Sequence, residues 1–131
     1  MYELKSPGVY GMGKKVEIEF DYMYEDRVMS HVVVYVDGEV AQINYTDNLV
    51  YHALREGAVY RDVEELFKGM IFDERRPDKR EVLDSFGLIE YDPIEIIKKT
   101  RGVMSTSKFW IRFKGDTVTW SDLRGMFTII V

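Results

Sequence analysis

The chain has 131 residues, of which 46% are hydrophobic and 31% charged, which predicts one folded domain and excludes a disordered chain or a second independent domain. The lack of cysteine excludes disulfides, thiolate metal sites and a cysteine nucleophile. The net charge of −5 argues against a general nucleic-acid binder, and it is uneven, because residues 1–91 carry 11 basic and 19 acidic side chains and residues 92–131 carry 7 and 4.

Strands are predicted first along the chain. Apolar and polar side chains alternate over residues 16–23, which is the period of a strand with one buried face. Residues 27–36 are rich in β-branched side chains, and Asp37 and Gly38 separate them from a further extended segment at 39–45; this pattern is typical of a hairpin with a two-residue turn. We therefore expect an antiparallel meander whose middle strand is central and covered on both sides.

The middle of the chain predicts about four short helices. The first covers residues 46–55, with Thr46 as its cap and Leu49 and Val50 in its apolar stripe. A second is indicated by apolar side chains at helical spacing between residues 63 and 70.

Two further helices have clearer start signals. Asp78 and Glu81 fit a capping box for the third helix. Asp92 followed by Pro93 is the strongest signal, because Asp is a preferred cap and proline fits the first helical position; this fourth helix should end near Gly102.

The last part of the chain is predicted to be extended. Residues 108–113 read as a strand, residues 114–116 as a turn and residues 117–120 as its hairpin partner. The apolar residues 126–131 predict a buried strand or an interface strand, through which a homodimer could form. The order of elements, with strands first, helices in the middle and strands last, predicts an α+β fold. In this fold an antiparallel sheet, built from the N-terminal meander and a C-terminal hairpin, packs against the four helices.

The first residues do not look like a targeting segment. Residues 1–7 lack the basic flank and apolar stretch of a signal peptide, and no apolar run reaches the ~18 residues of a membrane span. We expect a cytoplasmic protein that does not associate with a membrane.

A glycine-rich segment at residues 8–15 has the spacing of a phosphate-binding loop. Lys15, however, stands where a Ser or Thr should ligate magnesium, and an alternating strand follows instead of a helix. We interpret the segment as a turn and expect no cofactor.

Catalysis has one local candidate. His52 lies near Asp47 and Tyr51, so a small hydrolase centred on His52 is an alternative function; the other histidine, His31, lies inside the predicted central strand. No spacing resembles a zinc or catalytic motif, so we expect neither a metal nor a catalytic residue.

An acidic face is the surface feature that the sequence places best. The alternation over residues 16–23 puts Glu17, Glu19 and Asp21 on one strand face at intervals of roughly 7 Å. Together with Glu64 and Glu65 they form a predicted binding surface for a basic partner. We expect that partner to be another protein, for example a nucleic-acid-processing enzyme.

A basic cluster marks the other end of the chain. Direct contact with nucleic acid is a weaker alternative to protein binding, and it would use the following residues, around which acids are scarce: Lys98, Lys99, Arg101, Lys108, Arg112 and Lys114. Trp110, Trp120 and Tyr2 suit interface anchors, but we expect the two tryptophans in the core.

A family resemblance covers about the last third of the chain. Residues 92–102, followed by Phe109-Trp110-Ile111 and Thr119-Trp120-Ser121-Asp122-Leu123, resemble small uncharacterised accessory proteins encoded beside HipA-like kinases in Gram-positive bacteria, phages and mobile elements. The resemblance carries no catalytic residue. It implies an inhibitor or regulator, antitoxin-like or anti-CRISPR-like, that binds a partner enzyme or host defence complex.

Overall fold

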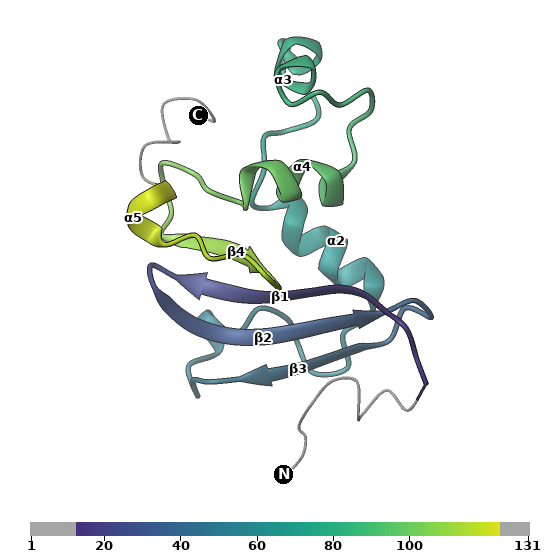
Figure 1. The fold of residues 1–131 in the computed structure, drawn as a ribbon, viewed down its shortest axis with the longest axis vertical. Helices are drawn as coiled ribbons and strands as arrows, with labels where there is room; N and C mark the ends of the chain where they lie inside the picture. Colours follow the sequence, from purple (N-terminus) through teal and green to yellow (C-terminus); the bar gives the residue numbers. More distant parts are fainter. Residues whose placement is uncertain (1–12, 124–131) are drawn as a thin grey trace.

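The computed structural model describes residues 13–123, which form an α+β fold around one four-stranded antiparallel sheet (Figure 1). Its strands are β1 (Val16–Tyr24), β2 (Arg27–Tyr35), β3 (Val40–Asn44) and β4 (Phe109–Phe113), in the spatial order β3-β2-β1-β4. The predicted fold class is therefore confirmed.

The N-terminal meander forms as the pattern predicts. Gly38, in the turn between β2 and β3, has φ +92°, a left-handed value that glycine adopts at little cost. Val32, Val33 and Val34 are all buried, because β2 lies between two other strands and is covered on both faces.

The C-terminal part contributes one strand instead of a hairpin. Strand β4 pairs with β1, whereas residues 117–119 are not in a strand and Trp120 begins helix α5 (Trp120–Leu123). The predicted partner strand is wrong because Thr119 and Asp122 form a reciprocal helix cap, with the Asp122 carboxylate accepting from the Thr119 N–H at 3.0 Å. The predicted strand at 126–131, with its homodimer interface, lies outside the described residues.

Three of the predicted helices are present: α2 (Tyr60–Lys68), α3 (Lys79–Ser85) and α4 (Pro93–Thr100). The Asp92 carboxylate caps α4 by accepting from the backbone N–H of Ile94 at 3.0 Å.

The helix predicted over residues 46–55 is wrong. Only Leu49–Tyr51 forms a short 3-10 turn, η2, capped by the side chain of Asn48. Leu49 and Val50 are exposed, whereas Ala53 and Leu54 are buried in the core from a segment outside any helix. The apolar residues here belong to a bent segment, in which an exposed pair is followed by a buried pair, and not to an amphipathic helix.

Apolar side chains gather on both faces of the sheet. The main core lies between the sheet and helices α2 and α4 (Figure 1), where Phe20, Phe67 and Ile97 are fully buried. A smaller cluster on the other face joins Met23, Trp110 and Leu123. No helix within residues 13–123 is long and apolar enough to cross a membrane.

Candidate functional site

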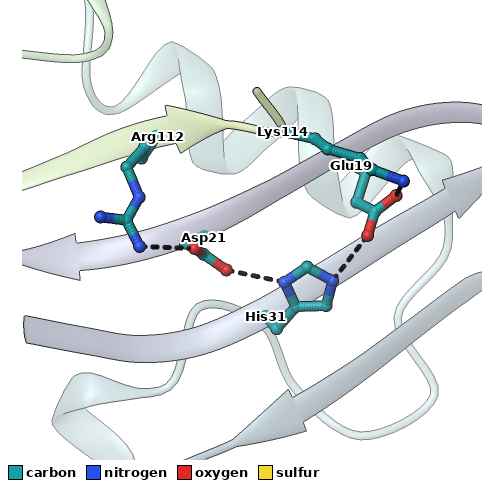
Figure 2. Close-up of polar contacts among 5 residues, drawn as sticks. All are labelled: Glu19, Asp21, His31, Arg112 and Lys114. Atoms are coloured by element: carbon teal, nitrogen blue, oxygen red, sulfur yellow. Dashed lines mark hydrogen bonds and ion pairs between the residues drawn. The ribbon is translucent and has the colours of Figure 1, made fainter. Parts of the chain in front are cut away.

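Strand register brings charged side chains from three strands to the face opposite α2 and α4. Asp21 of β1 pairs with His31 of β2 on one side and with Arg112 of β4 on the other. Paired residues of antiparallel strands point to the same face, so these three side chains are neighbours. Glu19 and Lys114 extend the group along the same face (Figure 2).

His31 lies between two carboxylates. Its Nδ1 is 2.7 Å from Asp21 Oδ1, and its Nε2 is 2.9 Å from Glu19 Oε2 (Figure 2). An ionised carboxylate only accepts hydrogen bonds, so the two contacts are both hydrogen bonds when both ring nitrogens carry a proton, which is the positively charged form of the imidazole. The pKa of His31 is raised accordingly, first by the hydrogen bond to Asp21, and burial opposes the rise.

Each of the two carboxylates that contact His31 also contacts a basic side chain. One basic residue lies on β4 and the other just after it. Arg112 Nη2 lies 3.0 Å from Asp21 Oδ2, and Lys114 Nζ lies 3.4 Å from Glu19 Oε1. Burial on its own raises the pKa of Asp21, but hydrogen bonds from His31 and Arg112 outweigh burial and leave that pKa lowered. We call these five residues the charge chain, in the order Lys114, Glu19, His31, Asp21 and Arg112.

The predicted acidic face is therefore largely neutralised. The side chains of Glu19 and Asp21 are only 11% and 21% exposed, and both are held in the charge chain. At Glu17 the alternation breaks, because Val16 pairs with Tyr35 whereas Ile18 pairs with Val34, which makes Glu17 the extra residue of a β-bulge.

The structure does not bring the remaining predicted acidic residues to this face. Glu64 and Glu65 lie on α2, which packs on the opposite side of the sheet. The five predicted acidic residues thus belong to two sides of the molecule.

The predicted basic cluster is mostly ion-paired. Besides Arg112 and Lys114 in the charge chain, Arg101 makes a two-pronged contact with Asp116 at 2.9 and 3.1 Å. Lys108 lies 3.4 Å from Glu25, and Lys98 lies 3.3 Å from Glu95. Lys99 is exposed on α4 and has no ion-pair partner among residues 13–123. Most of the charge available for phosphate is already matched.

The two histidines have different surroundings. Both ring nitrogens of His31 contact carboxylates, so in its protonated form it donates from both and has no lone pair to accept a further proton. His52 Nε2 contacts the backbone carbonyl of Thr46 and no carboxylate in the described part of the chain. In that same part, no three His, Cys, Asp or Glu side chains are grouped to hold a metal ion.

Sequence reasoning missed an exposed apolar segment. Tyr45, Leu49 and Val50 are 59%, 78% and 74% exposed, and Ile43 beside them is also exposed. The sequence pattern predicts Ile43 and Tyr45 in a strand and Leu49 and Val50 in the apolar stripe of a helix. The available signal was Asn48, which favours a turn at this point and caps η2.

Comparison of the chain with protein families, with curated proteins and with solved structures finds no match. The interpretation of the site therefore rests on geometry and chemistry.

Proposed function

We propose that this protein is a non-enzymatic binding protein that inhibits or regulates a partner protein. The observation that carries the proposal is the apolar segment at 43–50, with Leu49 and Val50 about three-quarters exposed. Soluble proteins rarely expose neighbouring large apolar side chains without a use, and such patches mark interaction sites. We call residues 43–50 the apolar segment.

The charge distribution supports a protein partner over nucleic acid. The charge chain cancels most of the basic surface near β4, and the chain as a whole carries −5. A partner protein with a basic surface around an apolar contact would match the acidic half of the chain. The enzyme or host defence complex implied by the family resemblance is the target that we propose.

Replacement of the exposed apolar side chains tests the proposal. A Leu49→Ser, Val50→Ser double variant should fold normally, because neither side chain is buried. We expect it to lose at least tenfold in recovery of the partner that the wild-type chain captures from the encoding organism, because the apolar contacts would supply most of the affinity. An Ile89→Ser variant, at an apolar side chain that is 83% exposed and lies outside residues 43–50, serves as a control and should still capture the partner. Undiminished capture by the serine variant would rule out this docking surface.

A further inference from the structure

Strand β3 is an edge of the sheet, and beyond the bridge between Glu39 and Val59 no further strand lies beside it in the described residues. The Tyr45 N–H donates to the Met29 carbonyl at 2.9 Å, which fixes the register with β2. Alternate residues of an antiparallel edge strand point their N–H and C=O groups away from the sheet, and in β3 these include Gln42 and Asn44. Within residues 13–123, the backbone groups of Gln42 and Asn44 make no hydrogen bond.

The opposite edge of the sheet is protected, whereas β3 is not. On β4, the outward N–H of Ile111 donates to the carbonyl of Arg101 at 2.8 Å, so another part of the chain covers that edge. Proteins usually shield an open edge with charged side chains, proline or a bulge, because an unpaired edge accepts further strands. The sequence of β3, Val-Ala-Gln-Ile-Asn, contains neither charge nor proline.

A groove runs along this edge. It has a volume of about 760 Å³ and is lined by β3 on one side and by Leu49 and residues 52–58 on the other. At the start of β3, Val59 already forms an antiparallel bridge with Glu39. An added segment would continue the pairing that this bridge begins.

The charges around the groove indicate what kind of segment could bind in it. Residues 37–62 contain five Asp and Glu side chains and two Arg, and Lys14 pairs with Asp37 and Glu39, so the surroundings of the groove carry a small net negative charge. The lining itself contains one acid, Glu56, and one base, Arg55. A second copy of this chain would bring two surfaces of the same net charge together. A segment with Lys or Arg between apolar side chains would complement both this net charge and the apolar segment.

We infer that β3 binds an extended, basic segment of the partner protein by strand addition, with the backbone of Gln42 and Asn44 as its pairing groups. Main-chain hydrogen bonds supply affinity in this mode, and alternate side chains supply specificity. The inference deepens the proposed function and rests on it.

Synthetic peptides test the binding mode directly. The probe is a fluorescent, terminally blocked peptide of alternating Lys and Val, compared with the same peptide carrying Glu in place of Lys. We expect saturable binding of the basic peptide by fluorescence anisotropy, at least tenfold weaker binding of the acidic one, and backbone amide shifts in NMR spectra centred on Gln42 and Asn44. No binding of the basic peptide, equal binding of both, or shifts centred on residues 98–114 would overturn the inference.

A variant pair isolates the backbone contribution. Gln42→Pro removes the outward N–H, whereas Gln42→Ala retains it; both lose the side-chain hydrogen bonds from Gln42 to the carbonyls of Leu54 and Arg55. Binding of the basic peptide should be about fivefold weaker for the proline variant than for the alanine variant, the effect of one lost hydrogen bond. Equal affinities in two variants with matched circular dichroism spectra would contradict strand addition.

The two proposals fail in different ways. If the Leu49→Ser, Val50→Ser variant loses the natural partner but Gln42→Pro captures it as well as Gln42→Ala does, the docking surface stands and strand addition is wrong. A dimer of the wild-type chain in sedimentation that Gln42→Pro abolishes would assign the edge to a second copy and overturn the inference.

Discussion

Asp21 and Arg112 are 91 positions apart in the sequence, yet they face each other across β1 and β4 with Oδ2 and Nη2 3.0 Å apart. The pair joins an acidic strand near the start of the chain to a basic strand near its end. Because Asp21 also contacts His31, the pair connects β4 to β2 through β1 (Figure 2).

A double-mutant cycle with Asp21→Asn and Arg112→Gln should give a coupling free energy of about 1 kcal/mol in urea unfolding. The pair is directly opposed and only partly exposed, so solvent screens it less than a surface pair. The matched control is the half-exposed pair of Glu95 and Lys98 on α4, for which we expect no more than ~0.5 kcal/mol. Equal coupling in the two cycles would mean that the sheet pair has no special role.

The contribution of His31 to stability should depend on pH. Its pKa is raised above the ordinary 6.5, so the fold favours the charged form; this stabilisation is fully present below pH 6.5 and is lost as pH rises through the folded-state pKa. The pKa of Asp21 is lowered from 3.8, so its own contribution is lost only as pH falls below that value. The difference in Tm between wild type and His31→Gln should therefore be greatest near pH 5 and shrink towards pH 9.

Removal of the carboxylates provides the control for this pH profile. In a Glu19→Gln, Asp21→Asn background, His31 has no anionic partner, and the effect of His31→Gln on Tm should lose its dependence on pH above 6. A persistent dependence in that background would assign the titration to another group.

The two tryptophans should differ in their effect on stability. Trp110 is fully buried, and its indole N–H donates to the Glu25 carbonyl at 2.6 Å, so Trp110→Ala should cost ~3–5 kcal/mol of unfolding free energy. Trp120 is only half-buried beside the same cluster, and Trp120→Ala should cost about 1–2 kcal/mol. Chemical denaturation of both variants measures the two losses of unfolding free energy. A larger loss for Trp120→Ala than for Trp110→Ala would contradict the prediction.

Two glycines with similar backbone angles offer a further comparison. Gly87 has φ +74° and open space around it, so Gly87→Ala should cost only the ~1–2 kcal/mol of a left-handed conformation. At Gly102, with φ +69°, an added Cβ would lie 2.9 Å from Met70 Cε and 3.2 Å from Met70 Cβ. We expect Gly102→Ala to lower Tm at least twice as much as Gly87→Ala does, and equal shifts would show that Met70 moves aside freely.

Local signals in the sequence predicted the local structure well. The Asp37-Gly38 turn, the strand at β1 and the cap at Asp92 each depend on a few neighbouring residues, and each is confirmed. The alternation in β1 fails only at its ends, where Val16 is exposed and Met23 is buried. The errors came where two local patterns compete. Residues 117–120 alternate like a strand, but the Thr119 and Asp122 cap makes a helix, and Asn48 turns the chain where apolar spacing predicted a helix.

The site could be predicted only in part, because strand order is not a local property. The sequence identified Glu19 and Asp21 as one surface and Arg112 and Lys114 as another. Only the pairing of β1 with β4 shows that they neutralise each other. Matching alternation of acids on one strand and bases on another was the signal that favoured this pairing.

The late position of β4 in the chain has a consequence during synthesis. Until residues 109–113 leave the ribosome, β1 is itself an open sheet edge, flanked only by β2. Glu19 and Asp21, which then share His31 but lack Lys114 and Arg112, place net negative charge along that edge and discourage nascent chains from joining through it. When Arg112 and Lys114 have been synthesised, the same carboxylates attract them and favour the pairing of β4 with β1. The two acidic side chains thus first disfavour pairing with other chains and then favour the native pairing.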